Sequence, residues 1–321
     1  MLQEKIEEFL TSSEANGRAS RTVETYRQRL ASFQQFMASQ AIYRLDRITP
    51  AAIDLWAVSL RRQGERYTGH PHRPIEDGGL ANSTIAGRIQ AVKTFLAFCV
   101  DRGHLDRSPA GHLKKPRAEG STKDKVMTLA DLRLLEAEAE RRAKAGRPRD
   151  LALVRFVADT GVRRGEIVTL RISRLNLEKN EAQVRGKTRN WKEWRTVDFG
   201  HRTAEALRDW LDARPYADHD FVFVNLGRNP DRFGQPLTPQ GVYQFFKRLA
   251  KVAGVKGRYN PHAVRHLVGQ HFTDMTNLEV ARQKLGHTDI ATTAMFYAHQ
   301  DRDRVKKASK RHSLLNHISS E

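Results

Sequence analysis

Apolar residues recur at steps of three and four along residues 1–107, which is the period of an amphipathic helix. One such stripe consists of Val23, Tyr26, Leu30, Phe33 and Met37. A second stripe follows Thr49-Pro50, where a capping hydroxyl precedes a proline suited to the first helical turn. A third follows Asn82-Ser83 and includes Cys99. The pattern predicts an all-helical first domain.

The composition changes between residues 108 and 125. This segment holds Ser108-Pro109, Lys114-Lys115-Pro116 and Glu119-Gly120-Ser121, a combination typical of an extended, basic tether. We therefore predict three parts: a helical domain at 1–107, a basic linker at 108–125 and a second domain at 126–321.

The second domain begins with helices and then changes period. Thr128 to Asp131 resembles a capping box, and a helix from about residue 150 is expected to stop at Thr160-Gly161, before a short helix with Arg163, Glu166 and Leu170. Residues 182–187 and 195–199 alternate in the manner of strands around a polar turn. Residues 221–224 are expected to add a short strand. The predicted fold is mainly α, with a small antiparallel sheet in the C-terminal domain.

The charge balance narrows the choice of partner. The 321 residues include 56 Lys and Arg against 37 Asp and Glu, a formal net charge of +19. Such an excess favours a polyanion, and nucleic acid ranks ahead of a membrane surface. No apolar run of membrane-spanning length, signal peptide or lipidation motif is present in the sequence. We expect a cytoplasmic protein.

The sequence gives little support for metal or disulfide chemistry. Cys99 is the single cysteine, and its place on an apolar stripe predicts a small buried side chain. His70 and His72 lie in the segment 62–80 without a metal-ligand pattern around them, so a solvated loop is predicted there. We expect neither a metal nor a cofactor.

Residues suited to phosphodiester chemistry are spread over the second domain. They are Arg163 after Thr160-Gly161-Val162, then Lys187, His262, Arg265, His287 and Tyr297. Metal-free cleavage needs a nucleophile, cations on the non-bridging oxygens and an acid for the leaving oxygen. Tyrosine suits the role of nucleophile, and lysine suits the role of acid. The planar guanidinium of arginine suits the binding of the non-bridging oxygens. Each motif is weak alone, but in this order they predict an enzyme that cuts DNA with its own tyrosine.

Together these segments resemble the tyrosine recombinases, or phage integrase family, over nearly the whole chain. Residues 160–166 resemble the family's first arginine box, and Gly186-Lys187 matches its hairpin lysine. Residues 262–266 resemble the second box, and residues 285–293 the third. Residues 1–107 resemble the core-binding domain that often precedes the catalytic domain.

The resemblance implies roles in bond cleavage for three residues. Tyr297 would attack the scissile phosphate and form a 3′-phosphotyrosyl linkage. Lys187 would protonate the 5′-hydroxyl leaving group, and His262 would assist proton transfer to or from the tyrosine.

It also implies which residues hold the phosphate. Arg163 and Arg265 would bind it and stabilise the transition state, and His287 would hydrogen-bond one of its oxygens. Glu166 and Asp289 would support the site residues beside them.

The tyrosine departs from the family pattern by one position. The family's usual place, nine residues after His287, is Phe296 here, and Tyr297 follows it. Because Ala298-His299 then resembles the family's usual ending, we expect a connecting loop longer by one residue. The alternative is a DNA-binding relative in which Tyr297 belongs to the core.

The turn between the predicted strands is also long. It includes Trp191, Lys192 and Trp194, and a basic aromatic tip of this kind suits a DNA groove. Lys192 is a rival for the acid role, although Lys187 has the better spacing.

The C-terminal tail carries apolar residues at helical spacing. They are Leu314, Leu315 and Ile318, after a basic stretch that ends at Lys310-Arg311. Such a helix packs either on its own domain or on a neighbouring subunit.

The resemblance implies a site-specific recombinase that works through a Holliday junction, as a homotetramer on two double-stranded DNA sites. Integration or excision of a mobile element and resolution of a replicon both remain open, as do a partner recombinase and an accessory DNA-bending protein. The alternatives are a type IB topoisomerase, which shares the catalytic set, and a non-catalytic clamp that regulates a recombinase. A third alternative, a protein that binds a membrane surface or RNA, is supported by the net charge alone.

Overall fold

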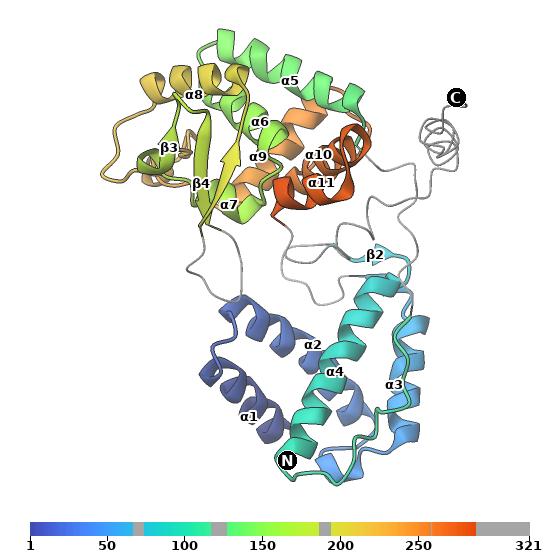
Figure 1. Cartoon of the computed structure of the whole chain (residues 1–321). Coiled ribbons are helices and arrows are strands. Elements are labelled where there is room, and N and C mark those ends of the chain that lie inside the picture. Colours follow the sequence, from blue (N-terminus) through green and yellow to red (C-terminus); the bar gives the residue numbers. More distant parts are fainter. Residues whose placement is uncertain (67–73, 117–126, 186–193, 258, 287–321) are drawn as a thin grey trace, which may run out of the picture. The chain divides into compact units, whose positions relative to one another are not determined.

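The computed structural model describes residues 1–66, 74–116, 127–185, 194–257 and 259–286 (Figure 1). The chain divides into two compact units, Met1–Ser121 and Thr122–Glu321, and each has its own apolar core. The described start of the predicted linker packs on the first unit: Ala110 is fully buried, and Lys93 donates hydrogen bonds to the carbonyls of Gly111 and Leu113. The limits predicted for the linker itself stay a prediction.

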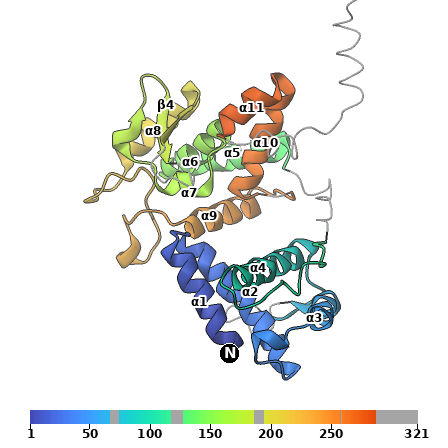
Figure 2. The same ribbon diagram turned by 60° about the horizontal axis from the view of Figure 1, so that its bottom comes forward.

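The described residues of the first unit form four helices, which are labelled in Figure 2. They are α1 (Leu2–Ala15), α2 (Ser20–Ser39), α3 (Pro50–Arg62) and α4 (Asn82–Asp101), with a short η1 (Leu45–Arg47) and a pair of two-residue strands, β1 (Glu65–Arg66) and β2 (Glu76–Asp77). All three predicted stripes are confirmed as the buried faces of α2, α3 and α4. Thr49 caps α3 by accepting the N–H of Ala52 at 3.2 Å. Helix α1 was not singled out in the sequence, although Leu2, Ile6, Phe9 and Leu10 give it a buried stripe of the same kind.

The second unit is mainly helical. Its elements are α5 (Leu129–Lys144), α6 (Pro148–Thr160), α7 (Arg164–Val168), η3 (Ile172–Arg174), β3 (Leu175–Asn176), β4 (Glu181–Arg185), β5 (Trp194–Asp198), α8 (His201–Ala213), η4 (Pro230–Arg232), α9 (Pro239–Val252), α10 (Pro261–Met275) and α11 (Leu278–Leu285). The capping box at the start of α5 is confirmed, because Thr128 and Asp131 hydrogen-bond each other's backbone N–H.

A three-stranded antiparallel sheet in the order β3-β4-β5 accompanies these helices. The predicted hairpin is confirmed as β4 and β5, with Val184 opposite Arg195. The third strand was predicted in the wrong place: it is β3, whereas residues 221–224 form only isolated bridges to Arg171 and Pro236. Val222, Phe223 and Val224 are all buried, so this segment is enclosed on every side and does not alternate between two faces.

Helix α6 lies at the centre of the second unit and contacts α5, α8 and α10. Leu153, Phe156 and Val157 of α6 are fully buried in this core. Helices α10 and α11 pack side by side, as both ribbon views show (Figures 1 and 2). The end of α6 and the start of α7 therefore meet the last two described helices.

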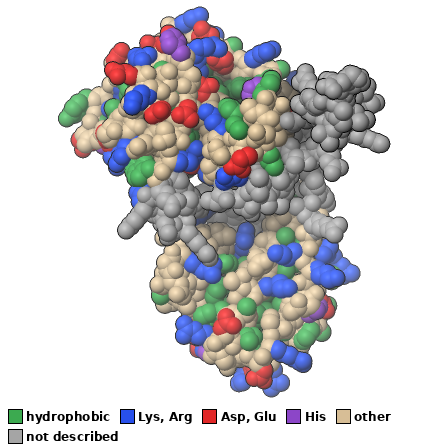
Figure 3. All heavy atoms as spheres, viewed as in Figure 1, with side chains coloured by type: hydrophobic (Ala, Val, Ile, Leu, Met, Phe, Trp, Pro, Cys, Tyr) green, Lys and Arg blue, Asp and Glu red, His purple; other side chains and the backbone are tan. Residues whose placement is uncertain are grey.

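Lys and Arg side chains are visible over both units, with acidic side chains between them (Figure 3). Within the described ranges, no helix combines the length and the apolar composition needed to span a membrane.

Candidate active site

The turn between α6 and α7 depends on a glycine. Gly161 ends α6 in the left-handed region, with φ of 59°, which side chains other than glycine rarely adopt. A Cβ placed there would lie 2.7 Å from Cδ2 of Leu285 and 3.2 Å from Cγ1 of Val268. Glycine thus lets α6 approach α10 and α11 closely, and Arg163 follows at the N-cap of α7.

Arg163 is held by hydrogen bonds and stays partly exposed. Its backbone N–H donates to Oε2 of Glu166 at 2.7 Å, and its Nη1 donates to Oε1 at 3.2 Å. Its Nη2 donates to the carbonyl of Gly286 at 3.3 Å. About a third of the Arg163 side chain (34%) stays exposed, against 2% of Glu166. The guanidinium is held by Glu166 and Gly286, and the side chain as a whole stays partly exposed.

Arg265 reaches the same place from α10. It is buried, with 3% of its surface exposed. Its Nη1 donates to the carbonyl of Gly161 and its Nη2 to that of Leu285, both at 2.6 Å. The carboxyl end of a helix carries partial negative charge on its unpaired carbonyls. The end of α11 therefore brings Arg163 and Arg265 together, although they are distant in sequence.

His262 lies one helical turn before Arg265, close to the two arginines. Asn260 caps this helix by accepting the N–H of Ala263, and Pro261 occupies its first turn. Partial desolvation lowers the pKa of His262, and the positive charges of Arg265 and Arg163 lower it further. At neutral pH the imidazole is therefore neutral and able to accept a proton.

A third arginine belongs to this cluster and was missed in the sequence. Arg195 of β5 donates from Nη2 to Oε2 of Glu166 at 2.9 Å and from Nε to Oε1 at 3.3 Å. Its Nη1 donates to the carbonyl of Lys284 at 3.3 Å. The one signal available was a basic residue on a strand of the hairpin, which does not reveal a partner twenty-nine positions earlier.

Glu166 is the anion between Arg163 and Arg195. Burial raises the pKa of this carboxyl, but the hydrogen bond and charge of Arg195 and the N–H of Arg163 outweigh it, so the pKa is lowered overall. Glu166 stays ionised in a buried position. Three arginines and one carboxylate leave a net charge of about +2, which suits a phosphodiester anion.

Three predicted site residues, Lys187, His287 and Tyr297, lie outside the described residues, as do Lys192 and Asp289. The described chain leads toward two of them: β4 ends at Arg185, and α11 ends at Gly286, directly before His287. The structure thus brings Arg163, His262 and Arg265 together. The places of the other three stay a prediction.

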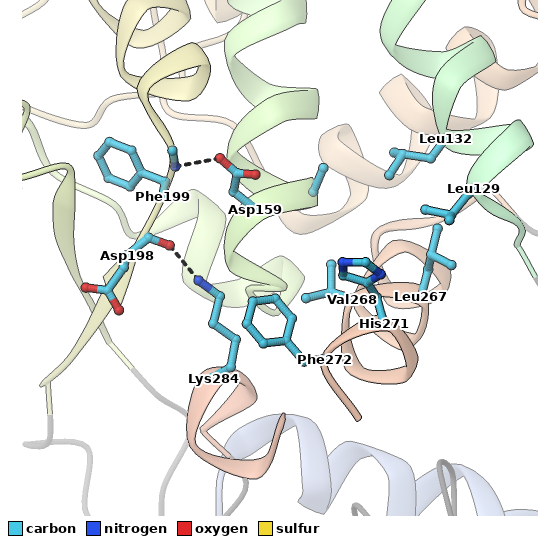
Figure 4. Close-up of a pocket in the computed structure, with 12 residues that line it drawn as sticks. Leu129, Leu132, Asp159, Asp198, Phe199, Leu267, Val268, His271, Phe272 and Lys284 are labelled. Atoms are coloured by element: carbon cyan, nitrogen blue, oxygen red, sulfur yellow. Dashed lines mark hydrogen bonds between the residues drawn. The ribbon is translucent and has the colours of Figure 1, made fainter. Parts of the chain in front are cut away.

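A pocket of about 380 Å³ in the second unit has a different set of lining residues from this cluster (Figure 4). Leu129, Leu267 and Phe272 are among its lining residues, and none of the three described site residues lines it. Figure 4 shows Lys284 of α11 directed at Asp198, whose carbonyl accepts its Nζ at 2.7 Å. Asp159 accepts the N–H of Gly200 at 2.8 Å. These contacts fasten the end of β5 to α11 and to α6.

A sequence profile of the phage integrase family matches residues 125–304, and a profile of the phage integrase N-terminal SAM-like domain matches residues 6–103. The chain belongs to the phage integrase family, and its relatives XerC and XerD carry the name tyrosine recombinase.

Relatives in this family align along most of the chain. Tyrosine recombinase XerC of Roseiflexus castenholzii is 27% identical over 309 residues, covering 92% of this chain and 88% of that protein. Tyrosine recombinase XerD of Staphylococcus saprophyticus is 26% identical over 305 residues, covering 94% of this chain and 96% of that protein.

Solved structures share the fold. The integrase of transposon Tn1549 in complex with transposon right end DNA has a TM-score of 0.73 at 16% identity, covering 96% of this chain and 98% of that one. The XerH recombinase bound to its difH substrate, in a post-cleavage complex, has a TM-score of 0.67 at 19% identity, covering 92% and 81%. The predicted fold class is confirmed.

Proposed function

We propose that this protein is a site-specific DNA recombinase that cleaves and rejoins double-stranded DNA through a 3′-phosphotyrosine intermediate. The observation that carries the proposal is the meeting of Arg163 and Arg265 at the carboxyl end of α11. From that point the chain continues into His287 and, ten residues later, Tyr297. The two arginines would thus contact the start of the segment that carries His287 and the nucleophile.

The proposed reaction exchanges one ester for another. The Tyr297 oxygen attacks phosphorus, the bond to the 5′ oxygen breaks, and Lys187 gives a proton to that leaving oxygen. Neutral His262 takes the tyrosine proton, in keeping with its lowered pKa. Because the phosphotyrosyl ester retains the bond energy, a 5′-hydroxyl of the partner strand can reverse the step without ATP. Neither a metal nor a cofactor takes part.

Arginine is suited to the phosphate because its planar fork donates to two oxygens at once and keeps its charge. Arg163 is held by Glu166 and the Gly286 carbonyl, and about a third of its side chain stays exposed for this role. Arg265 of α10 adds a second positive charge, and its guanidinium is held by the carbonyls of Gly161 and Leu285. Groups held in advance stabilise developing negative charge without having to reorganise.

We propose a homotetramer on two DNA sites, acting through a Holliday junction in the cytoplasm, since strand exchange between two duplexes requires four cleavages. The net charge of +19 supports binding to DNA. Integration or excision of a mobile element and resolution of a replicon are both compatible with this chemistry, with or without a partner recombinase or an accessory DNA-bending protein.

The test is recombination between two copies of a cleavage site on one plasmid. The site is first recovered by covalent capture from the native replicon, with a chelator present. We expect two product circles and a Holliday junction intermediate. Relaxation of plasmids of any sequence without exchange would indicate a topoisomerase, and binding without any covalent product would indicate a regulatory clamp.

A further inference from the structure

Glu166 is shared by two arginines, and the side chain of Arg163 is the more exposed of the two, at 34% against 19% for Arg195. We propose that Arg195 is a positioning residue for DNA cleavage: it satisfies the charge of Glu166, so that Arg163 keeps its guanidinium available to the phosphate. This inference rests on the proposed function, because it concerns the same phosphate site.

The Glu166 carboxylate accepts more side-chain hydrogen bonds from Arg195 than from Arg163. Arg195 donates two side-chain hydrogen bonds to Glu166, at 2.9 and 3.3 Å, whereas the Arg163 side chain donates one at 3.2 Å. Paired hydrogen bonds from one guanidinium are the stronger and more specific form of an arginine–carboxylate contact. Arg195 is thus the main counter-charge of Glu166, and Arg163 keeps the lesser share.

The Arg195 side chain lies against Gly286, where a larger residue would not fit. Its guanidinium is held at both ends, by Glu166 and by the Lys284 carbonyl, and 19% of the side chain is exposed. A Cβ on Gly286 would lie 2.7 Å from Cδ and 2.9 Å from Nε of Arg195. Glycine at the end of α11 therefore ends the helix, with φ of 62°, and also leaves room for this side chain.

Removing Arg195 would change the charge seen by the phosphate. Glu166 is almost fully buried, and a buried carboxylate that loses its main partner is costly unless another cation replaces it. Arg163 is the cation in reach. Its fork would turn toward Glu166, and the net charge of the cluster would fall from about +2 to about +1.

A purely structural role predicts something different. In that case Arg195 would matter because it ties β5 to α11. Lys284 makes a second tie between the same two elements, from its Nζ to the Asp198 carbonyl, and its side chain does not contact Glu166 in the described contacts. Lys284→Met is therefore the matched control: it removes a β5–α11 tie and leaves the charge on Glu166 balanced.

The experiment measures single-turnover cleavage and binding of the nicked duplex recovered with the wild-type protein, together with thermal unfolding of each variant. We expect Arg195→Ala to lower the cleavage rate about 100-fold with binding changed less than about threefold. Arg195→Lys should lose less than Arg195→Ala, since it keeps the charge. Lys284→Met should stay within about threefold of the wild-type rate.

The decisive variant is Arg195→Ala combined with Glu166→Gln. If Arg195 acts by balancing Glu166, removing the carboxylate charge should restore the cleavage rate about tenfold over Arg195→Ala. A double variant no faster than Arg195→Ala, or Lys284→Met as slow as Arg195→Ala, would overturn the proposal even if Arg195→Ala is poorly folded. A wild-type protein that forms no covalent product would overturn the proposed function itself, which separates the two failures.

Discussion

Arg265 donates a 2.6 Å hydrogen bond to the carbonyl of Gly161, a residue 104 positions earlier in the chain. The contact joins Arg265 of α10 to the turn that positions Arg163. A second bond from Arg265, to the Leu285 carbonyl, joins the same turn to the end of α11. The three segments that carry the site are therefore one hydrogen-bonded assembly, and a disturbance of the turn should reach the chemistry.

Gly161→Ala should destabilise the second unit. The new Cβ would lie 2.7 Å from Cδ2 of Leu285, and the turn would hold alanine at a φ of 59°. We expect a loss of about 2–4 kcal/mol in the free energy of unfolding, measured by chemical denaturation. The control is Gly165→Ala in α7, where a Cβ would meet no atom within 4 Å. It should be neutral or stabilising by about 0.5–1 kcal/mol, and equal losses in both variants would contradict the close approach at Gly161.

Arg163→Ala should abolish chemistry and spare binding. The phosphate would lose its open guanidinium, so we expect the cleavage rate to fall about 100- to 1,000-fold. DNA affinity, measured by gel shift, should change little because most backbone contacts lie elsewhere. Arg133→Ala removes the same charge from α5, where the side chain is exposed. A comparable fall in both variants would mean that net charge, and not the placement of Arg163, determines the rate.

The pH dependence of cleavage should report His262. Desolvation and the charges of Arg265 and Arg163 place its pKa below 6.5, so the reactive neutral form prevails at neutral pH. The rate should hold steady as the pH falls to about 6.5 and decline only below it. His262→Gln should remove this acid limb. A wild-type midpoint above 6.5 would contradict the assigned environment.

The lowered pKa values of His262 and Glu166 also predict how the free energy of unfolding changes with pH. A pKa lowered by folding means that the unfolded chain binds more protons within the shifted range. The contribution of His262 is therefore present above 6.5 and lost as the pH falls through its lower folded pKa. Glu166 behaves alike below 4.5. Glu166→Gln should flatten the loss of stability in that acid range, as measured by thermal unfolding at several pH values.

Binding to DNA should weaken steeply with salt. If each protomer neutralises about six phosphates, log affinity should fall about five units per tenfold rise in salt, through counterion release. Fluorescence anisotropy on a labelled duplex across a salt series measures this slope. A flat response would be incompatible with a chain that grips the DNA backbone.

Hydrophobic period and capping residues were enough to predict the helices near the site. The stop at Gly161 is a local signal, and it is confirmed. The pairing of Arg195 with Glu166 is not local, since it depends on which face of β5 meets α7 and α11. The segment 221–224 was mistaken for a strand because continuous burial gives the same apolar run as a buried strand.

Covalent trapping tests the central claim most directly. Nicked DNA from the native replicon is incubated with the protein and a chelator, for the wild type and Tyr297→Phe side by side, and adducts are resolved on a denaturing gel. We expect an adduct with the wild type and none with Tyr297→Phe, and sequencing the trapped DNA would identify the site. An adduct that survives Tyr297→Phe would contradict Tyr297 as nucleophile, and tight binding without any adduct would contradict the recombinase chemistry altogether.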